Sequence, residues 1–325
     1  MSETLLEVKE LVVEFAQRKN RLRALDQVSI SIKRGEILGI VGESGAGKSL
    51  TGAAIIGLLE SPGFIASGSI HLHGERIDNL PAEAMRRIRG RKIGMVFQDP
   101  LTSLNPILTI ADQLIETIQT HLGGSKAQAR ARAITLLDEV GIPAAARRID
   151  DYPHQFSGGM RQRVVIALAL AGEPDLIIAD EPTTALDVSV QAQIIDVLKR
   201  ACNEHGAAVM LVTHDMGVIA ETADRVAVMY AGRVVEVGTV QQVIKQPHHP
   251  YTQGLMGSIP SLTERVERLV QIPGAMPRLD AIPSGCAFHP RCPQVSERCQ
   301  NQRPELIPLA QGEAACWLHA DEITQ

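Results

Sequence analysis

The chain has 325 residues and a formal net charge of −5, a length that accommodates one large domain with an appendage, or two domains. The mildly acidic balance argues against a general nucleic-acid-binding protein. No stretch approaches the roughly 18 consecutive apolar residues of a membrane-spanning helix, and the first residues carry acids where a signal peptide carries positive charge. We therefore expect a cytosolic chain that reaches a membrane through partner subunits.

Strands dominate the structure expected for the N-terminal part. Residues 5–33 alternate polar and apolar side chains, which is typical of antiparallel strands with one solvated face. A short buried strand is expected at 35–41, a helix at 49–59, and further strands at 68–73 and 93–97. A glycine-rich turn joins the buried strand to the helix.

That turn, residues 42–49, fits the phosphate-binding pattern G-x-x-x-x-G-K-[ST]. Its glycines let backbone N–H groups approach a phosphate closely. Lys48 supplies a positive charge for the β- and γ-phosphates, and Ser49 offers a hydroxyl to Mg²⁺. The order strand, loop, helix points a helix N-terminus at an anion. An ordinary glycine-rich turn is the alternative, which the flanking elements disfavour.

The centre of the chain is expected to be helical and then to alternate strand and helix. Residues 101–171 carry apolar side chains at helical spacing. Continuous apolar runs at 176–179 and 208–212 suit parallel strands buried on both faces, with a crossover helix at 188–204 between them. This repetition predicts a parallel sheet with right-handed connections.

The composition changes near residue 256, and the last 70 residues hold 8 of the 18 prolines. We expect a main domain over residues 1–255 and a small loop-rich extension over 256–325. Four of the five cysteines lie in this extension, whereas Cys202 stands alone in a helical stretch and is expected to be a small buried side chain. A reducing cytosol disfavours disulfides, so the cluster of four favours a metal site.

Two further patterns carry chemistry. Asp180 and Glu181 follow the apolar run at 176–179, where parallel sheets bind ligands. Asp180 is expected to hold Mg²⁺, and Glu181 to polarise the water that attacks a γ-phosphate. The Ser-Gly-Gly segment at 157–159 begins a helix and leaves N–H groups free for a second anion. A plain N-capped helix is the alternative there.

Taken together, these motifs resemble those of the ATP-binding cassette (ABC) ATPases. Residues 156–160 match the signature sequence of that family, and residues 185–187, which end in Asp187, match its D-loop. Gln98 matches the glutamine-loop residue, and His214 matches the switch histidine that contacts the γ-phosphate. A P-loop kinase or GTPase would explain neither the signature segment nor this histidine.

The resemblance covers roughly residues 5–255. It implies an α/β P-loop NTPase core of ABC type, with an antiparallel β subdomain and an inserted helical subdomain at about residues 100–172. It also implies that the chain binds ATP and Mg²⁺. Phe15 is placed to stack on adenine, and a core strand residue is an equal alternative for it.

The resemblance assigns roles residue by residue. The expected Mg²⁺ ligands are Ser49, Gln98 and Asp180, and the expected catalytic residues are Gln98, Glu181 and His214. The expected nucleotide-binding residues are Phe15, Gly42, Glu43, Ser44, Gly45, Ala46, Gly47, Lys48, Ser49, Leu50, Gln98, Ser157, Gly158, Gly159, Asp180 and Asp187.

Segments at 97–106, 152–156, 249–252 and 285–293 narrow the resemblance to the dipeptide/oligopeptide importer branch. In that branch the tail cysteines can hold a [4Fe–4S] cluster, which four thiolates suit. The expected ligands are Cys286, Cys292, Cys299 and Cys316. Zinc is the second possibility, although its cysteines usually lie closer together, and four free thiols are the third.

Such a chain would be the ATP-hydrolysing subunit of a membrane importer for di- or oligopeptides or related small solutes, bound peripherally at the cytoplasmic side of the inner membrane. Two cassettes would close head to tail around ATP, the phosphate loop of one facing residues 157–159 of the other. The expected partners are a second and different ABC ATPase subunit, two membrane permeases and a periplasmic or extracellular solute-binding protein, without nucleic acid. The alternative is a soluble ABC ATPase acting on a macromolecular assembly.

Overall fold

The computed structural model describes residues 3–18, 20–184, 187–258 and 271–324. The chain divides into two compact units. The first, called here the helical unit, comprises residues 1–5, 32–37 and 79–212. The second, called here the P-loop unit, comprises residues 6–31, 38–78 and 213–325.

Three parallel strands form the centre of the helical unit. They are β6 (Ile93–Val96), β7 (Leu176–Asp180) and β8 (Ala208–Val212), with β7 in the middle. Every residue of β7 and β8 is buried, as two-sided coverage of a parallel sheet requires. Helix α8 (Val188–His205) connects β7 to β8. The predicted strand–helix–strand repetition is confirmed.

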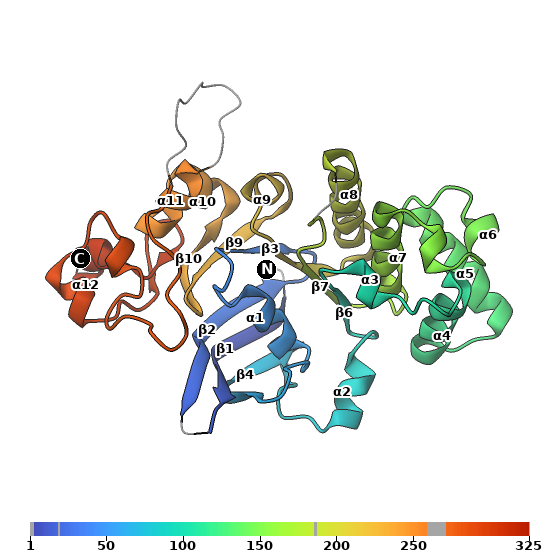
Figure 1. The fold of residues 1–325 in the computed structure, drawn as a ribbon, viewed down its shortest axis with the longest axis horizontal. Coiled ribbons are helices and arrows are strands. Elements are labelled where there is room, and N and C mark those ends of the chain that lie inside the picture. Colours follow the sequence, from blue (N-terminus) through green and yellow to red (C-terminus); the bar gives the residue numbers. More distant parts are fainter. Residues whose placement is uncertain (1–2, 19, 185–186, 259–270, 325) are drawn as a thin grey trace. The chain divides into compact units, whose positions relative to one another are not determined.

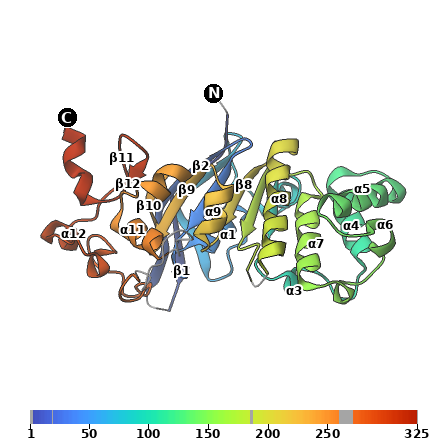
Figure 2. The ribbon, with the colours of Figure 1, turned by 90° about the horizontal axis from the view of Figure 1, so that it is seen from above.

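Helices make up the rest of this unit. They are α2 (Ala82–Ile88), α3 (Pro100–Ser103), α4 (Ile110–Leu122), α5 (Lys126–Glu139), α6 (Ala145–Arg148) and α7 (Gly158–Leu170), with a 3₁₀ turn, η1 (Pro153–Gln155). Helices α4, α5 and α7 pack against one another (Figure 2). The hydroxyl of Thr109 accepts the N–H of Asp112 and caps α4, and Ser125 forms a capping box with Gln128 at α5.

The P-loop unit contains a four-stranded sheet in the order β2-β1-β4-β5. Strands β2, β1 and β4 are labelled in Figure 1. Its strands are β1 (Thr4–Ala16), β2 (Arg21–Lys33), β4 (Gly63–Leu72) and β5 (Glu75–Arg76). Strand β1 pairs antiparallel with β4, and Phe15 lies opposite Gly63. Buried and exposed residues alternate along the second half of β2, which agrees with the predicted solvated face.

A second sheet of the P-loop unit carries the glycine-rich loop. Strand β3 (Ile37–Val41) runs parallel to β9 (Arg225–Tyr230), and β9 pairs antiparallel with β10 (Arg233–Thr239). The helices of this part are α1 (Lys48–Ile55), α9 (Met216–Thr222), α10 (Val240–Lys245) and α11 (Pro250–Gly257). Among the described helices of both units, none combines the length and the apolar character needed to cross a membrane.

The C-terminal extension joins this second sheet. Strand β12 (Glu313–Ala314) pairs with β10, and β11 (Ile307–Pro308) pairs with β12. The other described elements of the extension are short: η2 (His289–Arg291), α12 (Glu297–Asn301) and η3 (Trp317–Thr324). The loop-rich character predicted for this region is therefore found. The boundary predicted at residues 255–256 and the subdomain predicted at about residues 100–172 stay predictions.

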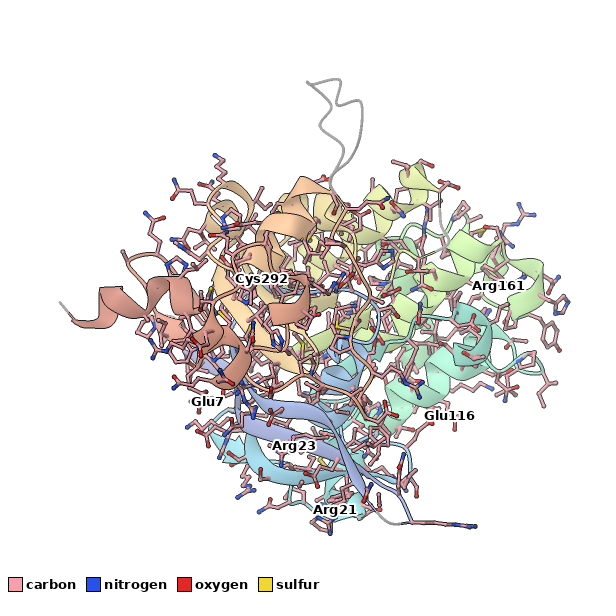
Figure 3. The ribbon with its side chains drawn as sticks, turned by 60° about the vertical axis from the view of Figure 1, so that its left-hand side comes forward. Glu7, Arg21, Arg23, Glu116, Arg161 and Cys292 are labelled. Carbon is pink, nitrogen blue, oxygen red and sulfur yellow. The ribbon has the colours of Figure 1, made fainter. Side chains whose placement is uncertain are left out.

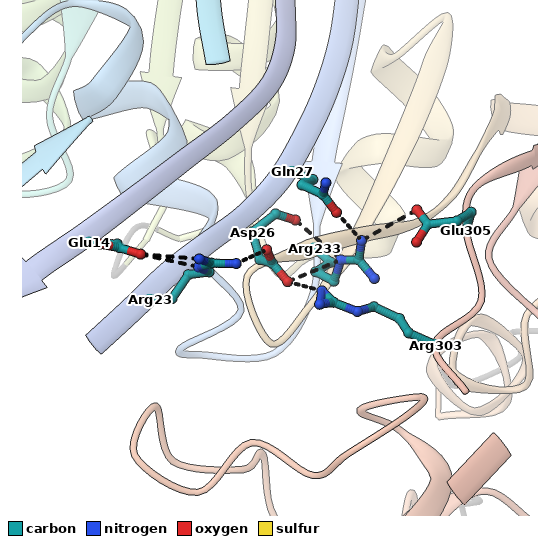
Figure 4. A network of polar contacts seen from close by, with 7 residues as sticks. All are labelled: Glu14, Arg23, Asp26, Gln27, Arg233, Arg303 and Glu305. Atoms are coloured by element: carbon teal, nitrogen blue, oxygen red, sulfur yellow. Dashed lines mark hydrogen bonds and ion pairs between the residues drawn. The ribbon is translucent and has the colours of Figure 1, made fainter. Parts of the chain in front are cut away.

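A polar network around one carboxylate ties the extension to β2 and β10 (Figure 4). Asp26 accepts a hydrogen bond from Arg23 at 3.0 Å and forms ion pairs with Arg233 of β10 and Arg303 of the extension. Glu305 adds a longer ion pair to Arg233, at 3.6 Å. Three guanidinium groups from three segments thus share Asp26, which joins the extension to both strands.

Helix α1 is shorter than the sequence predicts. We expected it to run to residue 59, but it ends at Ile55, and Gly57 adopts φ +69°. A left-handed glycine is a common end of a helix, because it has no Cβ to oppose that conformation. Strand β4 accordingly starts at Gly63 rather than at the expected residue 68.

The core of the helical unit can be tested on α4. Leu114 is fully buried, whereas Leu122 of the same helix is 37 % exposed. We expect Leu114→Ala to lower the free energy of unfolding by about 2–5 kcal/mol, because it removes transfer energy and leaves a cavity. Leu122→Ala should cost below about 1 kcal/mol. Urea unfolding followed by circular dichroism measures both, and equal losses would contradict this packing.

A buried histidine in the P-loop unit makes stability depend on pH. His249 is 1 % exposed at the start of α11, and its Nδ1 accepts the N–H of Tyr251 at 3.0 Å. Burial, with a smaller contribution from His319, lowers the pKa of His249 from 6.5 to about 3. The unfolded chain therefore takes up a proton below pH 6.5 that the folded chain does not.

His249 therefore makes its full contribution to the free energy of unfolding above the unfolded pKa of 6.5, and this contribution declines as the pH falls toward 3. Because of this residue, we expect the free energy of unfolding to be about 1.4 kcal/mol lower at about pH 5.5 than at about pH 7.5. Urea unfolding of the wild type and of His249→Asn, which keeps an acceptor at the helix start, measures the difference. A pH response that the substitution leaves unchanged would rule this explanation out.

Candidate functional site

The loop that follows β3 leaves no room for side chains at two of its glycines. Gly42 has φ +150°, and a Cβ there would lie 2.3 Å from the carbonyl oxygen of Met229. Gly47 has φ +101°, and its Cβ would lie 2.7 Å from Cδ2 of Leu25. A side chain at Gly42 would collide with the backbone, and a side chain at Gly47 would be strained by its left-handed φ and would displace Leu25. The sequence pattern therefore reflects a real steric constraint.

Lys48 begins α1 and is 6 % exposed. Its ammonium group donates hydrogen bonds to the carbonyl oxygens of Gly42 at 2.8 Å and Glu43 at 3.2 Å. The residue at the N-cap of α1 is Gly47, which has no side chain to cap the helix, and the N-terminal end of the helix dipole is positive. A fixed positive charge beside such a helix end is an arrangement that binds phosphate.

Glu43, the second residue of the loop, has two partners that the sequence did not predict. Its N–H donates to the hydroxyl of Tyr251 at 2.8 Å. Its carboxylate accepts hydrogen bonds from both terminal nitrogens of Arg291, at 2.7 and 3.0 Å. These partners lie 208 and 248 residues further along the chain. Tyr251 and Arg291 lie in the segments 249–252 and 285–293, which the sequence singled out without linking them to the loop.

In the helical unit, two strand ends bring Gln98 and Glu181 together. Because β6 and β7 are parallel neighbours, the residues after them lie at the same edge of the sheet. The amide nitrogen of Gln98 donates to the carboxylate of Glu181 at 3.0 Å, and the hydroxyl of Thr184 donates to it at 2.9 Å. Asp180, the last residue of β7, is 8 % exposed. Two carboxylates thus follow each other at this edge, one buried and one held by hydrogen bonds.

Glu181 also has an unusual backbone. Its φ is +46°, a left-handed conformation, and its N–H donates to the carbonyl oxygen of Val212 at 2.8 Å. A side-chain-bearing residue in this region costs of order 1 kcal/mol and persists where the surroundings fix it. The hydrogen bonds to Val212 and Gln98 are such surroundings, so the direction of this carboxylate is set by the fold.

The signature and D-loop segments both start helices. Ser157 caps α7 by accepting the N–H of Met160 at 3.4 Å, and Gly158 and Gly159 lie at the helix tip. Asp187 caps α8 by accepting the N–H of Val190 at 3.0 Å, and the hydroxyl of Ser189 holds the pKa of Asp187 below its usual value. Residues 185–186 of the expected D-loop lie outside the described residues.

Phe15 and His214 belong to the P-loop unit. Phe15 is partly exposed near the end of β1, and a Cβ added to Gly63 would lie 2.9 Å from its ring. The ring therefore rests on a glycine and keeps one part accessible. His214 is exposed in the turn before α9, which Asp215 caps by accepting the N–H groups of Gly217 and Val218.

The residues predicted from sequence thus fall into two sets, each placed within its own unit. The P-loop unit holds Phe15, residues 42–50 and His214, and the helical unit holds Gln98, residues 157–159, Asp180, Glu181 and Asp187. The structure brings Lys48 onto the carbonyl groups of its own loop and Gln98 onto Glu181.

The prediction of an iron–sulfur cluster, or of zinc in its place, is wrong. Among the described residues, which include Cys286, Cys292, Cys299 and Cys316, no group of three or more histidine, cysteine, aspartate or glutamate side chains could hold a metal ion. All four are free thiols lining one small cavity, and Cys292 is labelled in Figure 3. Spacing along the chain placed them in one region but did not set the donor geometry that a metal needs.

The environment of these cysteines also favours thiols over thiolates. Burial raises the pKa of Cys286 and Cys292, and it raises that of Cys316 to about 11. The sulfur of Cys299 lies 3.2 Å from the hydroxyl of Ser296. Cys202, outside this cluster, is buried as expected.

Comparisons with known proteins agree on a family. The family described as "ABC transporter" matches residues 25–184, and "Oligopeptide/dipeptide transporter, C-terminal region" matches residues 235–299. The dipeptide transport ATP-binding protein DppD of Escherichia coli (strain K12) is 46 % identical over 308 residues, which are 95 % of this chain and 94 % of that protein. The oligopeptide transport ATP-binding protein AppD of Bacillus subtilis (strain 168) is 45 % identical over 321 residues, 98 % of each chain.

A solved structure is similar as well. An ATP-binding cassette, described as a dimer in a post-hydrolysis state bound to ADP and Pi, has 31 % sequence identity and a TM-score of 0.66. The match covers 73 % of this chain and 99 % of the cassette. The expected P-loop fold of ABC type is thereby confirmed. The chain belongs to the ATP-binding subunits of ABC transporters, and within them to those with the oligopeptide/dipeptide transporter C-terminal region.

Proposed function

We propose that this chain hydrolyses ATP to drive a membrane importer of di- or oligopeptides or related small solutes. The observation that carries the proposal is that the nucleotide motifs and the C-terminal region occur together, in the same arrangement as in full-length relatives named for dipeptide and oligopeptide transport. No similarity supports the alternative of a soluble ABC ATPase that acts on a macromolecular assembly.

The two sets of residues divide the work of hydrolysis. Lys48 and the N–H groups that begin α1 bind the β- and γ-phosphates. Ser49, Gln98 and Asp180 would supply the oxygen ligands that Mg²⁺ prefers, and the bound ion would neutralise charge on the phosphates. Glu181 accepts a hydrogen bond from the attacking water and polarises it. The contact between Gln98 and Glu181 at 3.0 Å fits a pair that acts on the same water.

The remaining residues act on the same nucleotide. His214 contacts the γ-phosphate, Phe15 stacks on adenine, and Leu50 follows the loop into α1. The helix tip at residues 157–159 faces the ATP bound to a second cassette, and Asp187, at the end of the D-loop, contributes to the nucleotide site. ATP then holds two like-charged helix N-termini together, and its hydrolysis lets them separate.

The proposed partners rest on the resemblance to the peptide-importer branch. The second cassette is a different ATPase subunit, and two membrane permeases convert closure of the pair into transport. A solute-binding protein outside the membrane delivers the cargo. The chain works at the cytoplasmic side of the inner membrane, bound to the permeases. Exposed apolar side chains after Gln98 suit such docking, because Leu101 is 63 % exposed and Ile107 is 78 % exposed.

Glu181→Gln tests the hydrolytic role. The amide keeps the hydrogen bond with Gln98 but loses the charge that polarises water, so we expect ATP turnover to fall by roughly 10²–10⁴-fold with Mg·ATP still bound. A phosphate-release assay and calorimetric titration with Mg·ATP measure the two quantities.

The matched control is Glu173→Gln, another non-glycine residue with positive φ in the same unit, which should leave turnover unchanged. Full turnover in Glu181→Gln would overturn the assignment. With its partner cassette and Mg·ATP, the Glu181→Gln protein should form a stable pair in size-exclusion chromatography.

Ile107→Asp tests the docking surface. A charge at this exposed position should weaken co-purification with the permeases by roughly tenfold, since the apolar contact is lost, while the ATPase activity of the isolated cassette stays unchanged. The control is Leu122→Asp, at another exposed aliphatic residue of the same unit, which should leave the association with the permeases unchanged. Undiminished recovery of permeases with Ile107→Asp would exclude this surface.

A further inference from the structure

A buried arginine of the extension holds the phosphate loop. The guanidinium of Arg291 forms two parallel hydrogen bonds with the carboxylate of Glu43, at 2.7 and 3.0 Å. The side chain of Arg291 is 5 % exposed, and that of Glu43 is 33 % exposed. A bidentate pair of this kind fixes both distance and direction. An arginine 248 residues away therefore sets where Glu43 points.

Arg291 is itself held on every side. Its Nε donates to the carbonyl oxygen of Pro273 at 2.8 Å, and a terminal nitrogen donates to that of Gly274 at 3.4 Å. Another donates to the hydroxyl of Tyr230 at 3.4 Å. The guanidinium lies 5.8 Å from the ring of Tyr230 and 5.9 Å from that of Phe288. The group that meets the loop is thus rigid before any nucleotide arrives.

The backbone of Glu43 is fixed by the same layer. Its N–H donates to the hydroxyl of Tyr251, which is fully buried. The rings of Tyr230, Tyr251 and Phe288 contact one another with centroids 4.7–5.4 Å apart. Phe288 and Arg291 belong to the extension, whereas Tyr230 ends β9. The extension therefore contributes to the surface on which the loop rests.

The charge of Glu43 matters to a phosphate ligand. The carbonyl oxygen of Glu43 accepts a hydrogen bond from the ammonium of Lys48 at 3.2 Å, so one residue links the lysine and Arg291. An unpaired carboxylate in this loop would repel the phosphates and attract the lysine away from them. Arg291 neutralises that carboxylate and keeps it turned toward the extension.

We propose that Arg291 is a positioning residue for ATP: by pairing with Glu43 it keeps the phosphate loop and Lys48 ready for the nucleotide, and it makes the C-terminal extension a part of the ATP-binding site. The inference rests on the proposed role of the loop in ATP binding. It gives the extension a function within the cassette, in addition to any contact with other subunits.

The test measures Mg·ATP affinity by calorimetry in full-length protein carrying Glu181→Gln, so that the ATP is not consumed. Arg291→Met, which keeps length without charge, should weaken binding by roughly tenfold to a hundredfold. Adding Glu43→Gln should restore at least half of the lost free energy, because the repelling carboxylate is gone. Arg298→Met is the matched control: this arginine of the extension lies over Trp317 at 3.6 Å, and its removal should leave the affinity unchanged.

The outcomes separate the two hypotheses. If the parent protein binds ATP and Lys48→Ala abolishes binding, the role of the loop stands, and Arg291 is judged on its own. Unchanged affinity in Arg291→Met, or a loss that Glu43→Gln does not reverse, overturns the inference. Should Arg291→Met fail to fold by circular dichroism, Arg291→Lys keeps the charge but loses the bidentate geometry, and a several-fold loss reversed by Glu43→Gln is then expected.

Discussion

The loop between β3 and α1 must bring backbone N–H groups up to a phosphate, and this constraint shapes the rest of the P-loop unit. The backbone at Gly42 and Gly47 adopts positive φ angles in a crowded place, so these two positions cannot carry side chains that would stabilise the loop. Hydrogen bonds made by other residues stabilise the loop conformation instead. Lys48 bonds back to two carbonyl groups, while Tyr251 and Arg291 hold Glu43. The glycines would allow the loop many backbone conformations, and these contacts select one of them.

The helical unit meets a different requirement. Under the proposed function, hydrolysis needs a carboxylate directed at one water, and the edge of a parallel sheet is where such a residue lies. Glu181 adopts a left-handed backbone there, and Val212 and Gln98 hold it. The strained backbone of Glu181 depends on these hydrogen bonds, because without them the residue would relax to an ordinary conformation.

Much of this was predictable because it is local. The strands at 176–180 and 208–212, the helix at 188–205 and the glycine loop each depend on residues close in sequence. The partners of Glu43 were not predictable, because they lie 208 and 248 residues away and carry no pattern linking them to the loop. The metal prediction failed for a related reason: spacing gathers cysteines into one region, whereas coordination depends on where each sulfur points.

The contact between Arg291 and Glu43 also has a thermodynamic consequence that runs in both directions. If the extension favours the loop conformation that binds ATP, then bound ATP must favour the folded extension by the same free energy, because coupling between two sites is reciprocal. A short loop-rich segment with few elements of its own gains stability in this way from a ligand it does not touch. The nucleotide, the glycine loop and the C-terminal extension then form one cooperative unit, in which the carboxylate of Glu43 is the shared point of contact.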